Sequence, residues 1–233
     1  MTSKASRMDD KPATLLLTRP ESQSRAFLAD CEAHLGRSIP VVISPLMRIE
    51  PMGDVPDLER YTTIILTSGN GVARLGSALS GRHVVTVGER TAALAREHGA
   101  EAKHLGDDVE GFLENAATVR GPALFCRGVH SRGDLAKRLA ERGIEVEDAI
   151  LYDQVAEPLT NAARLLLAGS LPVVAPVFSP RSAKLLSSHR IAAPLTLLAI
   201  SQATADAWTG GGKVLVAERP NAAAMRALVT KAF

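Results

Sequence analysis

The residues best suited to chemistry lie in five short loops that combine hydroxyl side chains with glycine or arginine. The loops cover residues 67–71, 88–91, 127–128, 179–182 and 201–204, and each follows an apolar run and precedes a helical stretch. A Ser or Thr hydroxyl and the unpaired backbone N–H groups at a helix start bind phosphate or carboxylate groups well. One such loop is more often a simple helix cap, but five together favour a large ligand with several anionic groups.

Other chemistries find little support in the sequence. Gly69 and Gly71 lack the third glycine of a dinucleotide-binding fingerprint, and the chain has no Walker loop. Ser68 and Ser179 have no Gly-x-Ser-x-Gly context, so a nucleophile elbow is not indicated. The six histidines show no metal-ligand spacing, and the two cysteines are too far apart in sequence to form a paired motif. The sequence therefore predicts no metal and no organic cofactor.

Composition excludes several classes of protein. With 27 Lys and Arg against 25 Asp and Glu the formal net charge is +2, and aromatic residues make up only 3% of the 233 residues. A nucleic-acid binder usually carries a strongly basic face and stacking aromatics, so we expect no nucleic-acid partner. No apolar run reaches the roughly 18–20 residues that span a bilayer, so we expect no membrane partner. Residues 1–12 are polar and lack the apolar core of a signal peptide, so we expect a disordered tail on a cytoplasmic protein.

Short apolar runs alternate with amphipathic stretches along the chain. The apolar runs predict buried strands at residues 13–18, 64–67, 84–87, 123–126, 173–178 and 195–200. The amphipathic stretches predict helices at residues 23–35, 71–79, 91–98, 131–142, 182–189 and 204–208. This alternation is typical of an α/β fold, in which right-handed crossovers build a parallel sheet with helices on both faces.

The chain also repeats itself. Three pairs of segments correspond: residues 15–36 with 123–143, 64–79 with 176–188, and 84–100 with 196–212. The repeat aligns Arg19 with Arg127, Ser68 with Ser179, and Thr91 with Thr204. Three matches in the same order predict two copies of one α/β domain.

Two segments bounded by proline interrupt this pattern, at residues 45–51 and 152–158. Terminal prolines and alternating apolar residues predict exposed edge-type strands, and two such strands would form a hinge. The expected first lobe is discontinuous and takes residues 13–44 and 159–233. The expected second lobe takes residues 53–149, with hinge strands at residues 45–52 and 150–158.

The order of these motifs resembles the uroporphyrinogen-III synthase family over nearly the whole chain, from about residue 13 to residue 233. The resemblance rests on TRP (18–20), PLMRIEP (45–51), ILTSGNGV (65–72), VGERTA (87–92), CRG (126–128), LYDQ (151–154), FSPRSA (178–183) and PNAAAM (220–225). Each motif is loose by itself, and their number and order carry the match. This chain departs from the family pattern at Gly69, where a proline is common, and at Ser201, where a glycine commonly opens the loop.

The resemblance implies two small flavodoxin-like parallel-sheet lobes, related by internal duplication and joined by two antiparallel hinge strands. It implies a lyase of haem biosynthesis that cyclises hydroxymethylbilane to uroporphyrinogen III, with loss of water and inversion of the last pyrrole ring. The family uses no metal and no organic cofactor. We accordingly expect a monomer that acts on a small molecule, with transient hand-off from the preceding pathway enzyme.

The resemblance also suggests roles for particular residues. Tyr152 stands where the family has a tyrosine at the hinge, and it is the candidate catalytic residue, as a proton donor to the leaving hydroxyl. A phenol is a weak acid at neutral pH, so an ordinary strand aromatic is the alternative reading. Thr91 is expected to cap a helix. The residues expected to bind substrate carboxylates are Arg19, Thr67, Ser68, Asn70, Thr91, Arg127, Gly128, Ser179, Ser182 and Thr204.

A two-lobed binding protein is the alternative class of function. It would be a cytosolic sensor domain that binds a tetrapyrrole or another anion without catalysis. A nucleotide-dependent transferase is a third class, and the missing phosphate-binding motifs disfavour it. The isomer of the product formed from hydroxymethylbilane separates a synthase from a sensor.

Overall fold

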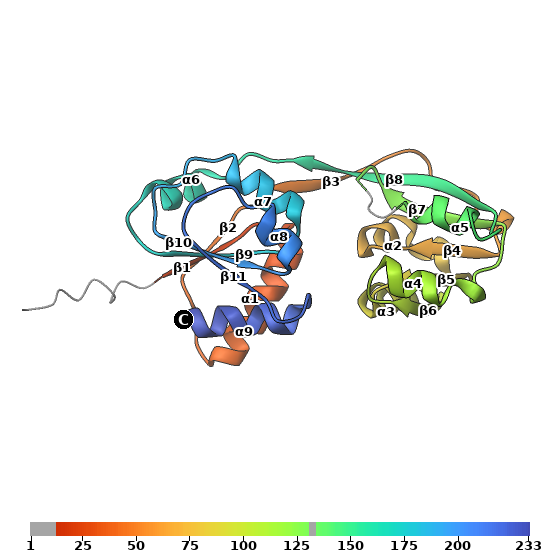
Figure 1. The fold of residues 1–233 in the computed structure, drawn as a ribbon, viewed down its shortest axis with the longest axis horizontal. Coiled ribbons are helices and arrows are strands. Elements are labelled where there is room, and N and C mark those ends of the chain that lie inside the picture. Colours follow the sequence, from red (N-terminus) through yellow and green to blue (C-terminus); the bar gives the residue numbers. More distant parts are fainter. Residues whose placement is uncertain (1–12, 131–133) are drawn as a thin grey trace, which may run out of the picture. The chain divides into compact units, whose positions relative to one another are not determined.

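The computed structural model shows that the chain folds into two units (Figure 1). The structure describes residues 13–130 and 134–233, so the tail expected at residues 1–12 and the helix start expected at residue 131 lie outside the described residues. The first unit contains the chain up to Arg48 together with Ala156–Phe233, and the second contains Ile49–Val155. The chain therefore enters the second unit once and returns once.

The first unit is built on a sheet of five parallel strands. They are β1 (Thr14–Leu17), β2 (Val41–Ile43), β9 (Val173–Val177), β10 (Leu195–Ala199) and β11 (Lys213–Val216), in the order β11-β10-β9-β1-β2. All five residues of β9 are buried. A parallel strand that is covered on both faces needs such a continuous apolar run, which is why this strand is evident from the sequence.

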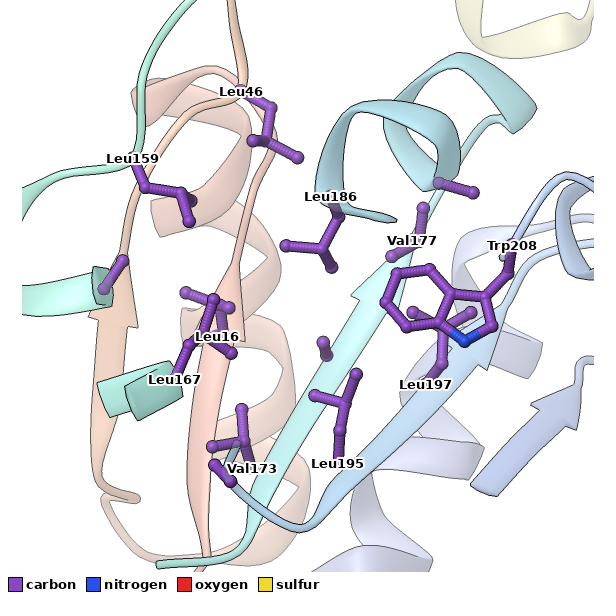
Figure 2. Packing of buried hydrophobic residues seen from close by; sticks show 14 residues of the cluster. Leu16, Leu46, Leu159, Leu167, Val173, Val177, Leu186, Leu195, Leu197 and Trp208 are labelled. Atoms are coloured by element: carbon purple, nitrogen blue, oxygen red, sulfur yellow. The ribbon is translucent and has the colours of Figure 1, made fainter. Parts of the chain in front are cut away.

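Helices cover both faces of this sheet. They are α1 (Glu21–Leu35) and α9 (Ala222–Ala232) on one face, and α6 (Asn161–Ala168), α7 (Pro180–Ser187) and α8 (Gln202–Asp206) on the other (Figure 1). Successive residues of a strand point to opposite faces, so Leu15 packs with α1 and α9, whereas Leu16 packs with α6 and α7. Figure 2 shows the second of these cores, in which Leu167 and Trp208 lie among leucines and valines of the sheet.

The second unit is built on a six-stranded sheet. Its strands are β3 (Met47–Pro51), β4 (Thr63–Leu66), β5 (His83–Val87), β6 (Glu101–Gly106), β7 (Ala123–Gly128) and β8 (Val146–Ala156), in the order β3-β8-β7-β4-β5-β6. The strands from β8 to β6 are parallel to their neighbours. The described helices are α2 (Gly69–Leu75), α3 (Glu89–Glu97), α4 (Val109–Glu114) and α5 (Leu135–Ala140), with short 3-10 turns η1 (Leu58–Arg60), η2 (Gly76–Leu79) and η3 (Ala116–Thr118).

This sheet also has two cores. Ile64 and Leu66 of β4 pack with Val72 of α2, whereas Ile65 packs on the opposite face with Phe112 of α4. Helix α3 shares the first face and α5 shares the second. The helices therefore cover both faces, and the strand ends stay open for function.

Corresponding strands occupy corresponding places in the two sheets. The first sheet runs β2-β1-β9-β10-β11, and five strands of the second run β8-β7-β4-β5-β6. Strand β1 thus matches β7, and β9 matches β4, which are pairs of segments that repeat in the sequence. The chain order reverses between β1 and β9 and between β4 and β7. In open α/β sheets, ligands bind outside the carboxyl ends of the strands at such a switch point.

The prediction that the segment around Tyr152 is an exposed edge strand is wrong. Strand β8 pairs with β7 on one side and lies next to β3 on the other, and only 1% of Leu151 and 5% of Tyr152 is exposed. The proline that suggested an edge, Pro158, lies beyond the end of the strand. The strand expected at residues 45–52, observed as β3, is the edge strand, and β8 lies between it and β7 as an interior strand.

A matched pair of leucines in α6 tests the core of the first unit. Leu167 is 1% exposed and Leu165 is 75% exposed, in the same helix. Leu167→Ala should lower the free energy of unfolding by about 2–5 kcal/mol, because it leaves a cavity. Leu165→Ala should change it by less than about 0.5 kcal/mol. Urea unfolding followed by the fluorescence of Trp208, which belongs to the same core, measures both. Equal losses would contradict this packing.

Candidate functional site

Polar side chains gather where the strands at the switch point of the second sheet end. Thr67 and Ser68 follow β4, while Arg127 and Gly128 close the neighbouring β7. Ser68 is the N-cap of α2, and its hydroxyl oxygen accepts a hydrogen bond from the backbone N–H of Asn70 at 3.2 Å. The cap fixes where α2 begins, and so fixes which face of the helix carries Asn70.

A pocket of about 380 Å³ includes Asn70 in its wall. It is lined by Ile49 and Pro51 of β3, by Asn70, Ala73 and Arg74 of α2, and by Tyr152 of β8. All of these residues belong to the second unit. The structure thus brings together two residues that the sequence singled out, Asn70 and Tyr152. It adds Arg74, which the sequence reasoning missed although its spacing of four from Asn70 places both on one helix face.

Gly128 provides the room for the ring of Tyr152. The two residues lie opposite each other in the pairing of β7 with β8, where the register shifts. A Cβ atom on Gly128 would lie 2.6 Å from Cε2 and 2.9 Å from Cζ of Tyr152. The backbone oxygen of Tyr152 also accepts a hydrogen bond from Val129 N–H at 3.0 Å. Close packing and backbone pairing therefore hold the ring at the pocket.

The two arginines of the sequence repeat already have partners. Arg127 Nε lies 2.8 Å from Asp148 Oδ2, and Arg127 Nη1 donates to Gly128 O at 3.2 Å. In the first unit, the guanidinium carbon of Arg19 lies 4.3 Å from the centre of the Phe178 ring, within cation–π range. Both arginines lie at the carboxyl ends of their strands, with their side chains held by neighbours.

Hydroxyl pairs mark the carboxyl ends of β9 and β10 in the first unit. Ser179 caps α7, with its Oγ 3.1 Å from Ser182 N and 2.9 Å from Ser182 Oγ. Ser201 caps α8 in the same way, at 3.3 Å from Thr204 N and 3.1 Å from Thr204 Oγ1. The structure therefore brings these predicted residues together on adjacent strands, and it gives each hydroxyl pair a capping role.

Thr91 is not the helix cap that the sequence suggested. Helix α3 begins at Glu89, and its N-cap is Gly88, which has φ +81° and no side chain to make a cap hydrogen bond. Thr91 is the third residue of the helix, is 8% exposed, and donates its backbone N–H to Gly88 O at 3.1 Å. The left-handed conformation of Gly88 turns the chain early, so the helix starts before Thr91. Thr91→Ala would therefore remove no cap.

The two cysteines of the chain are buried. Cys31 and Cys126 are free, and burial raises the pKa of each thiol to about 12. A thiol with so high a pKa supplies almost no thiolate at neutral pH. Within residues 13–130 and 134–233, no three His, Cys, Asp or Glu side chains come together to hold a metal ion. No helix in this part of the chain is long and apolar enough to cross a membrane.

Gly128→Ala is expected to destabilise the second unit, because its methyl group would collide with the ring of Tyr152. Overpacking of this kind costs about 1–3 kcal/mol. In a Tyr152→Val background the same substitution should cost much less, since the smaller side chain leaves room for the methyl group. Unfolding of wild type, the two single variants and the double variant measures the coupling. Equal costs of Gly128→Ala in both backgrounds would contradict the packing.

Comparison with known proteins identifies the family. The family model described as uroporphyrinogen-III synthase HemD matches residues 32–227. Among solved structures, uroporphyrinogen-III synthetase from Helicobacter pylori 26695 has a TM-score of 0.66 and 18% identity, covering 95% of this chain and 100% of that chain. A mutant uroporphyrinogen III synthase from the extremely thermophilic bacterium Thermus thermophilus has a TM-score of 0.54 and 19% identity, covering 94% of this chain and 98% of that chain. No curated protein sequence matches the chain significantly.

These findings confirm the resemblance that the motif order indicated. At identities below 20%, the two solved structures establish a shared α/β fold. The family model extends over most of the sequence and includes all of the pocket residues. The chain belongs to the uroporphyrinogen-III synthase family.

Proposed function

We propose that the carboxyl ends of both sheets bind the acetate and propionate groups of hydroxymethylbilane. The family to which the chain belongs closes this linear tetrapyrrole to uroporphyrinogen III, with loss of water and inversion of the last ring. Family membership over residues 32–227 is the observation that carries the function, and it disfavours a sensor domain without catalysis. The proposal concerns which residues of this chain perform each task.

The substrate carries eight carboxylates, and the switch points of both sheets offer suitable donors. In the second unit these are Thr67, Ser68, Asn70 and Arg127, with Thr91 in the first turn of α3. Their counterparts in the first unit are Arg19, Ser179 and Ser182, together with Thr204, which is fully buried and contributes through its hydrogen bond with the Ser201 hydroxyl. The cap hydroxyls keep oxygen lone pairs and O–H groups besides the bonds within their pairs. Many moderate contacts of this kind would bind a flexible polyanion without depending on any one of them.

The reaction needs a proton donor at the leaving hydroxyl and a defined conformation of the rest of the substrate. Departure of the hydroxyl, protonated as water, leaves an electrophilic azafulvene on the first ring. The substituted carbon of the last ring then attacks it, and the resulting spiro intermediate opens. It closes again, with that ring inverted, through the ring's free carbon, which loses its hydrogen as a proton to solvent. Spontaneous closure takes the route without inversion, so the protein must hold the less accessible near-attack geometry.

Tyr152 is the proposed proton donor to the leaving hydroxyl. It lines the pocket with Asn70, and Ile49 and Pro51 supply apolar surface beside it. A phenol next to the leaving hydroxyl can transfer its proton to it directly. The phenolate would regain its proton from solvent after the product leaves.

We also propose that the molecule arose by internal duplication, with β3 and β8 as the hinge strands. The matching strand orders β2-β1-β9-β10-β11 and β8-β7-β4-β5-β6 support the duplication. Hydrogen bonds from Glu157 N–H to Leu46 O at 2.8 Å and from Met52 N–H to Leu151 O at 2.9 Å support an antiparallel pair. We propose a cytoplasmic monomer that works without a metal or organic cofactor, with transient hand-off of substrate from the preceding enzyme.

Product analysis tests the proposed function. Purified protein given hydroxymethylbilane, with no metal, nucleotide or flavin added, should form mainly uroporphyrinogen III. Separation of the product isomers after oxidation to porphyrins measures the ratio. Formation of only the uninverted isomer, at the rate of the blank, would contradict synthase activity and favour the sensor domain.

The two tyrosines of the chain provide a matched test of the proton donor. Tyr152→Phe removes the hydroxyl and keeps the ring on Gly128, so the melting temperature should change little. Loss of the proton donor should lower turnover about a hundredfold or more. The control is Tyr61→Phe in the same unit, where the hydroxyl bonds Glu147 at 2.6 Å outside the pocket, and turnover should stay near wild type. Full single-turnover rate in Tyr152→Phe would remove Tyr152 from the mechanism.

A further inference from the structure

Arg74 brings a positive charge to the pocket that contains Tyr152. It lies on the same face of α2 as Asn70, and both residues line the pocket. Arg74 Nη2 donates a hydrogen bond to Gly53 O at 2.7 Å. Gly53 has φ +62°, a left-handed conformation that turns the chain just after β3 and presents this oxygen. One of the five N–H groups of the side chain is thereby anchored.

The remainder of the guanidinium group has unused hydrogen-bonding capacity. Arg74 Nε is buried and has no hydrogen-bond partner in the part of the chain that the structure describes. No carboxylate from these described residues forms an ion pair with Arg74. Other arginines of the same unit do have one: Arg82 lies 2.9 Å from Glu59, and Arg127 lies 2.8 Å from Asp148. A buried N–H without an acceptor is destabilising, so an anionic ligand that accepts its hydrogen bond would offset that cost.

The pocket places this charge among mostly uncharged neighbours. Ile49, Pro51 and Ala73 form much of the wall, and none of the lining residues is acidic. A charge-assisted hydrogen bond is stronger among apolar neighbours than in water. At about 380 Å³ the pocket is at the small end of the range for ligand sites, roughly 300–1,000 Å³. That size suits one substituted pyrrole ring and excludes the complete tetrapyrrole.

We propose that Arg74 binds a side-chain carboxylate of the pyrrole ring that contacts Tyr152, and so positions that ring for loss of its hydroxyl. The inference rests on the proposed function and adds a positioning residue to it. A planar guanidinium can accept a carboxylate side-on through two N–H groups, which fixes the direction of the ring as well as its place. Asn70, one turn earlier on the same helix face, can donate to the same carboxylate.

Two substitutions separate a carboxylate role from a structural one. Arg74→Gln removes the charge and shortens the side chain, whereas Arg74→Lys keeps the charge and loses the two-pronged geometry. For hydroxymethylbilane, Arg74→Gln should raise KM roughly tenfold or more, with a smaller effect on kcat. Arg74→Lys should give an intermediate KM. Both variants should melt within a few degrees of wild type, and KM is measured well below the melting temperature.

The matched control is Arg82→Gln, which removes an arginine of the same unit that is paired with Glu59 and lies outside the pocket. Its KM should match wild type. Unchanged KM in Arg74→Gln, in an active and folded protein, would overturn the role of Arg74 and leave the proposed function standing. Equal rises in KM for Gln and Lys, each with a large loss of melting temperature, would also overturn it in favour of a purely structural bond to Gly53. An inactive wild type would overturn the proposed function and this role with it.

Discussion

The packing of the Tyr152 ring on the backbone of Gly128 is the contact on which the candidate site depends. No side chain fits at position 128 while the ring lies where it does, because even a methyl group would approach Cε2 to 2.6 Å. The ring in turn closes one side of the pocket whose other walls are β3 and α2. Gly128 was expected to contact substrate through its backbone. The structure adds a packing role to that expectation, because Gly128 makes room for the ring of the residue proposed for proton transfer.

The serines that cap the helices also combine a structural role with a capacity to bind ligand. Ser68, Ser179 and Ser201 each accept a hydrogen bond from a backbone N–H in the first turn of the helix that follows. A cap contributes about 1 kcal/mol to stability, and its residual hydrogen-bonding capacity faces the end of the sheet where α/β proteins bind ligands. Structural capping and carboxylate binding are therefore compatible at one residue. A substrate with eight carboxylates suits a protein whose polar groups are spread over many helix starts.

The sequence predicted the interior of the fold well because interior parallel strands leave an unambiguous pattern. Strands β4 and β9 are buried at every residue, and both were recognised as apolar runs. Strands β6 and β11 were missed, since each is an edge strand in which exposed residues such as Glu101 and Lys213 interrupt the pattern. The burial of Tyr152 was also missed. The segments now seen as β3 and β8 were expected to join as hinge strands, but their local periodicity did not reveal that β8 also pairs with β7 and so lies inside the sheet.

The candidate site was predictable in part, because some of its residues belong to sequence motifs. Asn70 and Tyr152 stand in recognisable motifs, and the structure places both at one pocket. Arg74 belongs to no motif, and its bond to Gly53 and its unpartnered Nε within the described residues distinguish it from a surface arginine. Thr91 was assigned as a cap because threonine is common there, but the glycine three residues earlier starts the helix. The backbone conformations of Gly53 and Gly88 therefore explain why the sequence reasoning missed Arg74 and misassigned Thr91.

A crystal structure of the protein with uroporphyrinogen III bound under anaerobic conditions tests the central claim most directly. The account predicts a pyrrole ring in the pocket lined by Ile49, Asn70 and Tyr152. The Tyr152 hydroxyl should lie next to the bridging carbon that closes the macrocycle, and the ring of Tyr152 should still rest on Gly128. Product bound with that pocket unoccupied, and with the Tyr152 hydroxyl remote from the new bridge, would contradict the account.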